Sequence, residues 1–171
     1  MQRTRWPTLS RLAAVTALAA AAAPALAQAP AEPPPVERDA DYHNRQLLYL
    51  YALDPAQGWR TTASGLRYRK VSGSGAGPRP APTDTVTIHS VGRFIDGEEF
   101  DSSVARGEPA TFPLPRLIRG WQEGVPLMNV GDRYEFAIPW SLAYGPVGRG
   151  PIPGGATLLF TIDLIAIVPP S

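Results

Sequence analysis

Strict alternation of apolar and polar positions marks several segments in the second half of the chain. In residues 85–93 the alternation places Val86, Ile88 and Ser90 on one face. A period of two residues predicts a strand with one buried face. Residues 66–71, 132–138 and 157–168 are predicted as further strands. The last of these carries one apolar set on one face: Leu158, Phe160, Ile162, Leu164 and Ala166.

Turn signals and one helical segment separate these strands. The pair Asp96-Gly97 predicts a two-residue hairpin turn. Residues 118–125 predict a helix, with Pro126 at its end, where the missing N–H costs little. Several short strands with one helix among them predict an antiparallel sheet packed on a helix, which is an α+β domain.

A second, short helix is predicted ahead of the strands, over residues 41–53. Asp39 or Asp41 is the expected N-cap, because an aspartate side chain can accept from the free N–H groups of the first turn. Pro55 and Gly58 follow and end the helix. Its apolar side chains require a partner surface, which is either the domain itself or a second copy of the chain.

The first 27 residues have the pattern of a secretory signal peptide. A basic start is followed by an alanine-rich apolar stretch over residues 12–23, and residues 25–27 read ALA. Cleavage is expected before Gln28. The apolar stretch is shorter than the roughly 20 residues that a membrane span needs, so no stable membrane insertion is expected. We expect an exported protein, in the periplasm or fully secreted, with a disordered segment rich in Pro and Ala over residues 28–36.

Composition and charge exclude several classes of function. Without the three arginines of its first 27 residues, the chain keeps 13 basic and 15 acidic residues, a net charge of −2, which is no footprint for nucleic acid. The chain has no cysteine and only two histidines, His43 and His89, so neither a metal site nor thiol chemistry is expected. Twenty prolines argue against a helical bundle.

Two features of the sequence are candidates for specific chemistry: a Gly-rich segment and a cluster of acidic residues. Residues 72–77 read SGSGAG, but a proline-containing segment follows instead of the helix that a phosphate-binding loop requires, so a flexible turn is the better interpretation. Asp96, Glu98 and Glu99 belong to a solvated hairpin. Asp101 directly follows Phe100 and is the one acid of the cluster that is a candidate for a buried, functional carboxylate.

Aromatic side chains are the remaining signal. They lie near loops rich in Gly and Pro, and residues 145–155 form one long irregular loop. Together they indicate an apolar pocket at one end of the sheet, which by itself supports a small-ligand or peptide binder. The aromatic residues concerned are Phe100, Phe112, Trp121, Tyr144 and Phe160.

Four sequence blocks follow one another in the second half of the chain. Residues 96–103 read DGEEFDSS and residues 117–124 read LIRGWQEG. Residues 142–145 read LAYG, and residues 152–160 begin with IP and end with ATLLF. With these four blocks in order over roughly 100 residues, which is a specific signal, the chain resembles the FKBP-type (FK506-binding) peptidyl-prolyl cis-trans isomerases. The stretch TASGLRY before them is similar to the lead-in of exported bacterial members.

The resemblance implies a half-barrel sheet wrapped around one short helix, with a proline pocket between them. It implies an isomerase domain over residues 61–171, after a signal peptide (1–27) and a linking segment with a short helix (28–60). The implied ligands are proline-containing polypeptide clients and macrolides of the rapamycin type, without a cofactor. The residues implied as catalytic are Asp101, Tyr144, Phe100 and Ile118, and those implied as substrate-binding are Trp121, Leu117, Phe160, Ser90, Ile152 and Arg106.

Three departures from the family pattern affect the expected pocket. Ser90 stands where the family usually has a tyrosine, so the pocket should be wider and Asp101 less fixed. Ala110 replaces a wall phenylalanine of some members. The sequence IPGG at residues 152–155 should make the tip of its loop looser.

These departures leave two functions open. The first is an isomerase that speeds the folding of exported proteins. The alternative is a proline-binding chaperone or holdase module that has lost turnover through Ser90. Exported relatives often carry a long helical dimerisation domain, but only residues 28–60 stand in its place, so a monomer or a weak homodimer is expected.

Overall fold

The computed structural model describes residues 40–168. The signal peptide, the Pro/Ala-rich segment and the N-cap at Asp39 lie outside these residues. Among the described residues, no helix has the length and apolarity that crossing a membrane requires.

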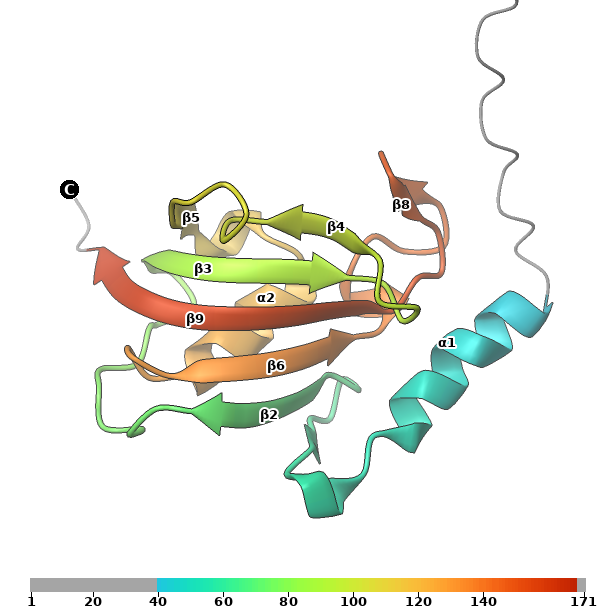
Figure 1. Cartoon of the computed structure of the whole chain (residues 1–171), viewed down its shortest axis with the longest axis horizontal. Coiled ribbons are helices and arrows are strands. Elements are labelled where there is room, and N and C mark those ends of the chain that lie inside the picture. Colours follow the sequence, from blue (N-terminus) through green and yellow to red (C-terminus); the bar gives the residue numbers. More distant parts are fainter. Residues whose placement is uncertain (1–39, 169–171) are drawn as a thin grey trace, which may run out of the picture. The chain divides into compact units, whose positions relative to one another are not determined.

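The described chain forms a seven-stranded antiparallel sheet and a separate two-stranded ribbon, with one helix on a face of the larger sheet and another at its end (Figure 1). The sheet order is β1–β2–β6–β9–β3–β4, with β5 also paired to β3. The strands are β1 (Arg60–Thr61), β2 (Arg67–Ser72), β3 (Thr85–Arg93), β4 (Glu99–Ser102), β5 (Ala110–Pro113), β6 (Arg133–Ile138) and β9 (Leu158–Val168), and a separate ribbon pairs β7 (Gly148–Arg149) with β8 (Ile152–Pro153). The predicted α+β fold is confirmed.

The helices formed by the described residues are short. Two are α-helices, α1 (Ala40–Ala52) and α2 (Arg119–Gly124), and four are single 3₁₀ turns: η1 (Pro55–Gln57), η2 (Leu114–Arg116), η3 (Val125–Leu127) and η4 (Trp140–Leu142). Helix α2 is the predicted central helix, and Pro126 falls in the 3₁₀ turn that continues it. Helix α1 begins one residue before Asp41, which therefore lies in its first turn.

The hairpin between β3 and β4 turns at the predicted place, but its loop has three residues, Ile95 to Gly97, instead of the predicted two, because the turn is centred on Ile95 and Asp96 and Gly97 follows it. The N–H of Gly97 donates to the carbonyl of Phe94 at 3.0 Å, and the N–H of Phe94 donates to the carbonyl of Glu98 at 2.9 Å. Gly97 has φ +93°, a conformation that costs glycine little. The Asp96 carboxylate accepts from the N–H of Glu98 at 3.0 Å, which fixes the turn.

Strands β3 and β9 form the centre of the sheet. They pair from Thr85–Val168 to Arg93–Leu159, and burial alternates along β3 as predicted, with Val86 and Ile88 fully buried. The register shifts between Thr87 and Ile88, so Ala166 lies opposite the outward-facing Thr87. The prediction that Ala166 shares the buried face of β9 was therefore wrong, because an inserted residue reverses the alternation beyond it.

Glycines allow α2 to lie close against the sheet. A Cβ atom on Gly124 would come within 2.7 Å of the Phe136 ring, and one on Gly120 would collide with Ile138. Both positions are buried against β6. This close approach creates the core between α2 and the sheet, and it fixes the position of Trp121 between the two glycines.

Helix α1 packs on the same domain through one stripe. Tyr42, Gln46 and Leu50 are buried, while Leu48 and Tyr51 are 65% and 75% exposed. The side-chain carbonyl of Gln46 accepts from the buried N–H of Thr157 at 2.8 Å. Of the two partner surfaces left open by the sequence, the domain receives this stripe.

The Gly-rich loop after β2 is held at several points. The N–H of Gly75 donates to the carboxylate of Asp132 at 2.9 Å, and the side-chain amide of Asn129 donates to the carbonyl of Gly77 at 2.6 Å. The N–H of Val130 donates to the carbonyl of Pro78 at 2.9 Å. A loop was predicted here, and these bonds tie it to the turn before β6.

Candidate functional site

A cavity of about 530 Å³ lies where one end of the sheet meets α2 and the β7–β8 ribbon. That volume is within the usual range of a ligand pocket. Its walls come from five regions of the chain: β3–β4, β5–η2, α2, the segment from Tyr144 to Ile152, and β9. The lining residues are Ser90, Phe100, Asp101, Phe112, Arg116, Leu117, Ile118, Trp121, Tyr144, Arg149, Gly150, Pro151, Ile152 and Phe160.

Four aromatic rings form the base of the cavity. Trp121 meets Phe160 edge-to-face, with ring centroids 5.2 Å apart and an interplanar angle of 90°. Phe160 meets Phe100 in the same way at 5.6 Å, and Phe112 meets Trp121 at 6.4 Å. Such edge contacts fix each ring in one orientation. The base is therefore a rigid apolar surface.

Gly92 makes this aromatic base possible. A Cβ atom at that position would lie 2.7 Å from the ring of Phe100 and 2.9 Å from the ring of Phe160. Real side chains essentially never approach so closely, so any larger residue would push one ring away. The glycine of the Ser90-Val91-Gly92 stretch is explained by this packing.

Trp121 carries an unusual polar group. Its side chain is 7% exposed, and its indole N–H has no acceptor among the described residues. A buried donor without a partner costs about 1–3 kcal/mol, and natural proteins rarely keep one without a use. Because Trp121 lines the cavity, a bound carbonyl group could satisfy this N–H.

Two further donors belong to the cavity lining. Ile118 immediately precedes α2, where the first N–H groups of a helix have no partner inside the helix. No acceptor for the Ile118 N–H occurs in the described part of the chain. The phenol of Tyr144 comes from the opposite wall, directly before the loop that leads to β7.

Asp101 lies at the edge of the cavity and forms an ion pair with Arg106. The two side chains are 47% and 50% exposed, and Nη1 of Arg106 is 2.6 Å from Oδ1 of Asp101. The expectation of a buried carboxylate was wrong. The sheet residue nearest to it in register on β3 is Gly92, which has no side chain to cover it, and Ser90 is small.

Ser90 points into the core and lines the cavity, and it is 4% exposed. Its N–H donates to the hydroxyl of Ser103 at 2.8 Å, and the N–H of Ser103 donates back to the Ser90 carbonyl at 3.0 Å. This reciprocal pair fastens the end of β4 to β3. His89 faces the other way, where its Nδ1 lies 3.0 Å from the same Ser103 hydroxyl, and does not line the cavity.

The loop that carries the far wall is firmly supported, contrary to the looser tip expected from its sequence. Gly154 and Gly155 are buried. The N–H of Gly155 donates to the carbonyl of Gly145 at 2.9 Å, and a Cβ on Gly155 would meet the ring of His43 at 2.8 Å. Helix α1 thus lies against Gly155 and supports the loop from behind.

Nine of the ten residues expected at the site line this one cavity, and Arg106 reaches it through Asp101. The sequence argument named Phe112 only as a nearby aromatic residue and missed Arg116, Arg149, Gly150 and Pro151. The irregular loop over residues 145–155 was the available signal for three of these. No sequence signal pointed to Arg116, because single arginines are common in loops.

An apolar cavity with an aromatic base and a few convergent donors has the character of a site for a compact apolar group with neighbouring carbonyls. A family model described as FKBP-type peptidyl-prolyl cis-trans isomerase matches residues 77–165. The chain belongs to this family.

Individual relatives agree with the family assignment. The chain is 50% identical over 123 residues to the FKBP-type peptidyl-prolyl cis-trans isomerase FkpA of Aeromonas hydrophila, covering 72% of this chain and 46% of that protein. It is 47% identical over 121 residues to the FKBP-type 22 kDa isomerase of Escherichia coli K12, covering 70% and 58%. The crystal structure of FkpA from Escherichia coli superposes with a TM-score of 0.71 at 38% identity, covering 76% and 61%. The chain therefore spans about half the length of the curated relatives it matches.

Proposed function

We propose that this protein is a peptidyl-prolyl cis-trans isomerase that accelerates the isomerisation of X–Pro bonds in polypeptide clients. The observation that carries the proposal is the aromatic cavity over Trp121, in a chain of the FKBP family. A prolyl ring is a compact apolar group flanked by carbonyls, which is the kind of group that such a cavity suits. Rotation about the bond breaks no covalent bond, so the reaction itself requires neither a nucleophile nor a cofactor.

The apolar walls would lower the barrier by excluding water. Rotation about a peptide bond crosses a barrier of about 18–20 kcal/mol, which comes from resonance between the C–N and C=O bonds. Water hydrogen-bonded to the imide carbonyl favours the charge-separated resonance form. A client carbonyl held against Phe100 and Phe160 loses that water, and the C–N bond loses double-bond character.

The two donors of the rim would hold the client through the rotation. The N–H of Ile118 and the hydroxyl of Tyr144 are assigned to carbonyls on either side of the proline, so that the twisted bond is bound more tightly than either planar form. A million-fold acceleration requires roughly 8 kcal/mol of such preference. Asp101 and its partner Arg106 are assigned to the edge of the cavity, where the carboxylate can accept an N–H of the client.

The clients are proposed to be exported proteins. This proposal rests on the signal-peptide pattern of residues 1–27, with the periplasm as the destination. The short segment over residues 28–60 and the isomerase domain over residues 61–171 complete the proposed organisation. On helix α1, Leu47 is 46% exposed and adds to the exposed side chains of Leu48 and Tyr51. This small apolar surface is consistent with a monomer or with a weak homodimer in which a second copy covers it.

The decisive experiment measures the isomerisation rate of a Leu-Pro or Phe-Pro tetrapeptide with and without a rapamycin-type macrolide. Fast catalysis that the macrolide blocks would support both the activity and the assigned pocket. A folded protein without catalysis would instead indicate the proline-binding holdase, with Ser90 as the first suspect. In that case, the variant Ser90→Tyr should gain activity.

A further inference from the structure

Two exposed arginines line the cavity without an acidic partner. Arg116 comes from η2, and Arg149 comes from β7. Neither forms an ion pair or hydrogen bond with another side chain in the part of the chain that the structure describes. By contrast, the arginines at 69, 93, 106 and 133 each have a carboxylate within 3 Å. The rim thus holds two cations that the fold leaves unneutralised.

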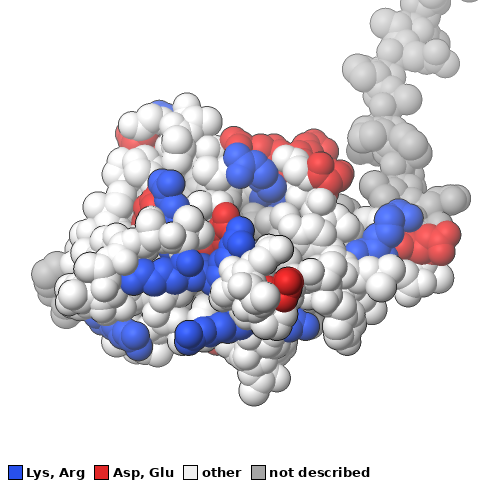
Figure 2. All heavy atoms as spheres, turned by 60° about the horizontal axis from the view of Figure 1, so that its bottom comes forward, with Lys and Arg blue, Asp and Glu red and all other residues white. Residues whose placement is uncertain are grey.

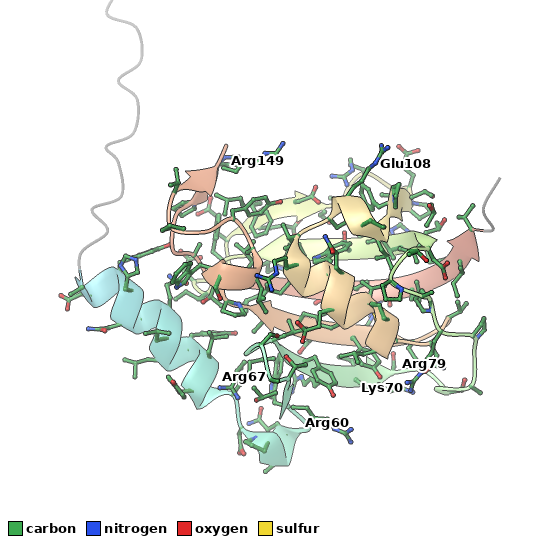
Figure 3. All side chains as sticks on the ribbon, turned by 180° about the vertical axis from the view of Figure 1, so that it is seen from behind. Arg60, Arg67, Lys70, Arg79, Glu108 and Arg149 are labelled. Atoms are coloured by element: carbon green, nitrogen blue, oxygen red, sulfur yellow. The ribbon has the colours of Figure 1, made fainter. Side chains whose placement is uncertain are left out.

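The carboxylate that lines the cavity does not neutralise Arg116 and Arg149. Among the lining residues described, the carboxylates are represented by Asp101 alone, and its charge is compensated by Arg106 at 2.6 Å. Glu108 lies on the connection between β4 and β5 and does not line the cavity, although Figure 3 shows it on the same side of the molecule as Arg149. The mouth therefore carries a net positive charge.

The two arginines belong to different walls. Arg116 lies two residues before Ile118, on the segment that leads into α2. Arg149 lies on the β7–β8 ribbon, and Figure 3 shows its side chain extending outward from the tip of that ribbon. Charges around a cleft with apolar walls focus the field into the opening. A guanidinium also suits a carboxylate better than an ammonium does, since it can donate two parallel hydrogen bonds.

We propose that the cavity selects X–Pro segments carrying Asp or Glu close to the proline, and that Arg116 and Arg149 are the residues that determine this specificity. The inference rests on the proposed function, since it uses the same cavity, and it names the class of client. An extended chain advances about 3.4 Å per residue, so three residues on either side of a proline seated over Trp121 span about 10 Å.

The test uses three capped peptides of the form acetyl-Xaa-Ala-Leu-Pro-Phe-Ala-Xaa-amide, with Xaa being Glu, Gln or Lys. Capping removes the terminal charges, so the three peptides differ only in the flanking side chains. Dissociation constants are measured by NMR titration of the protein at low salt, and isomerisation is measured by exchange spectroscopy in the same samples. We expect the Glu peptide to bind about tenfold more tightly than the Lys peptide, with Gln between them. Raising the salt concentration should shrink this ratio.

Substitutions assign the preference to the rim. In the double variant Arg116→Gln/Arg149→Gln, the ratio between the Glu and Lys peptides should fall to about one. The control is Arg60→Gln, which removes one positive charge, half of that removed in the double variant, from an exposed arginine on the opposite side of the molecule from Arg149 in Figure 3. It should keep the ratio of the unmodified protein. The charge reversal Arg149→Glu should move the preference toward the Lys peptide.

The outcomes separate this inference from the proposed function. Equal binding of the Glu and Lys peptides by the unmodified protein would overturn the inference, and so would a preference that survives in the double variant. Graded binding without isomerisation would refute the isomerase function and leave the charge preference standing. Absence of binding by all three peptides at millimolar concentration would refute both.

Discussion

At the scale of single residues, Trp121 is the clearest case of a side chain whose polar group serves no purpose inside the fold. Its ring supports the aromatic base, but its N–H has no acceptor among the described residues. The ring and the N–H therefore contribute to different properties. The ring contributes to stability and shape, whereas the N–H remains available to a ligand.

The variants Trp121→Phe and Trp121→Ala test this separation. Trp121→Phe keeps an aromatic ring and loses no protein hydrogen bond, so its free energy of unfolding should change by less than about 2 kcal/mol. Trp121→Ala should lose about 3–5 kcal/mol, because it removes the ring and leaves a cavity. Urea unfolding measures both. A Phe variant as unstable as the Ala variant would show that the indole N–H has an acceptor in the folded protein.

Tyr144 permits a matched deletion of one hydroxyl. If its phenol holds a client carbonyl, Tyr144→Phe should lower kcat/KM for a Leu-Pro peptide by a factor of about five, the worth of one hydrogen bond. The control is Tyr51→Phe, since Tyr51 is 75% exposed on α1 and is not part of the cavity lining. An unchanged kcat/KM in the Tyr144 variant would remove that residue from the proposed mechanism.

At the scale of elements, the loop after β2 depends on one buried carboxylate. Asp132 is 1% exposed and accepts from the N–H groups of Gly75 and Asn129 and from Lys70, whose Nζ lies 3.1 Å away. Burial opposes ionisation of this group, but the three donors outweigh it, and the pKa of Asp132 is lowered. The carboxylate thus joins β2, the Gly-rich loop and the turn before β6.

The lowered pKa of Asp132 makes the stability of this junction dependent on pH. The folded protein binds this proton more weakly than the unfolded chain does, so the stabilisation is fully present above the pKa of the unfolded state. It is lost as the pH falls through the pKa of the folded state, below about pH 4. In Asp132→Asn, the free energy of unfolding should be about 1–3 kcal/mol lower at pH 7 and should depend less on pH in the acid range.

Thermal unfolding monitored between pH 3 and pH 7 provides the measurement. Asp96→Asn is a suitable control, because Asp96 is exposed and an Asn side chain can still accept from the N–H of Glu98. A difference between Asp132→Asn and the unmodified protein that stays constant over the whole pH range would contradict the proposed role of the charge.

Helix α1 contacts the residue before β9 through a side-chain acceptor, Gln46. Gln46→Ala should lower the free energy of unfolding by about 1–3 kcal/mol, because the buried N–H of Thr157 loses its partner. Asn44→Ala is the control on the same helix, since Asn44 is exposed. Urea unfolding followed by tryptophan fluorescence compares the two. Equal stability of the variants would mean that water replaces the glutamine.

The elements that local patterns specify were predictable, and those set by distant partners were not. The alternation in residues 85–93 and the position of the turn near Asp96-Gly97 are encoded by neighbouring residues, and both were found, although the loop has three residues instead of two. The hydrogen bond between Asp132 and Gly75 joins residues 57 positions apart, and the one between Gln46 and Thr157 joins residues 111 positions apart. No local sequence pattern predicts contacts of this kind. Ala166 was misplaced because the shift opposite Thr87 depends on the partner strand.

The candidate site divides in the same way. The aromatic residues and the blocks around them indicated a pocket, and nine of the ten expected residues line the cavity. The exposure of Asp101 was not predictable, because it depends on which β3 residue lies opposite. Arg116 and Arg149 were missed because only the folded chain brings η2 and β7 to the same opening.

At the scale of the whole molecule, charge is distributed unevenly over the surface. Figure 2 shows lysine and arginine side chains gathered over the side on which β2 lies. Arg60, Arg67, Lys70 and Arg79, labelled in Figure 3, lie along this side. Since β1 pairs only with Arg67 and Tyr68, the rest of the outer edge of β2 is left without a neighbouring strand. Cations along such an edge oppose pairing with the strand of another molecule.

The order of the strands in the sheet predicts which backbone amides exchange most slowly with solvent. Strand β9 lies between β6 and β3 and is paired along most of its length on both sides. Strands β1 and β4 are short and lie at the two edges. Hydrogen exchange should therefore be slowest for the amides of β9, which open only with global unfolding, and faster for those of β1 and β4. Faster exchange in β9 than in β4 would refute this order.

The contact between His43 and Gly155 has a consequence for communication across the molecule. Helix α1 and the cavity share the segment from Tyr144 to Thr157, which α1 touches from behind and which forms one wall in front. If docking of α1 favours the closed form of this wall, thermodynamic reciprocity requires that a client in the cavity strengthen the docking of α1 by the same factor. Binding of a client in the cavity would then be detectable at α1, the first described element of the chain.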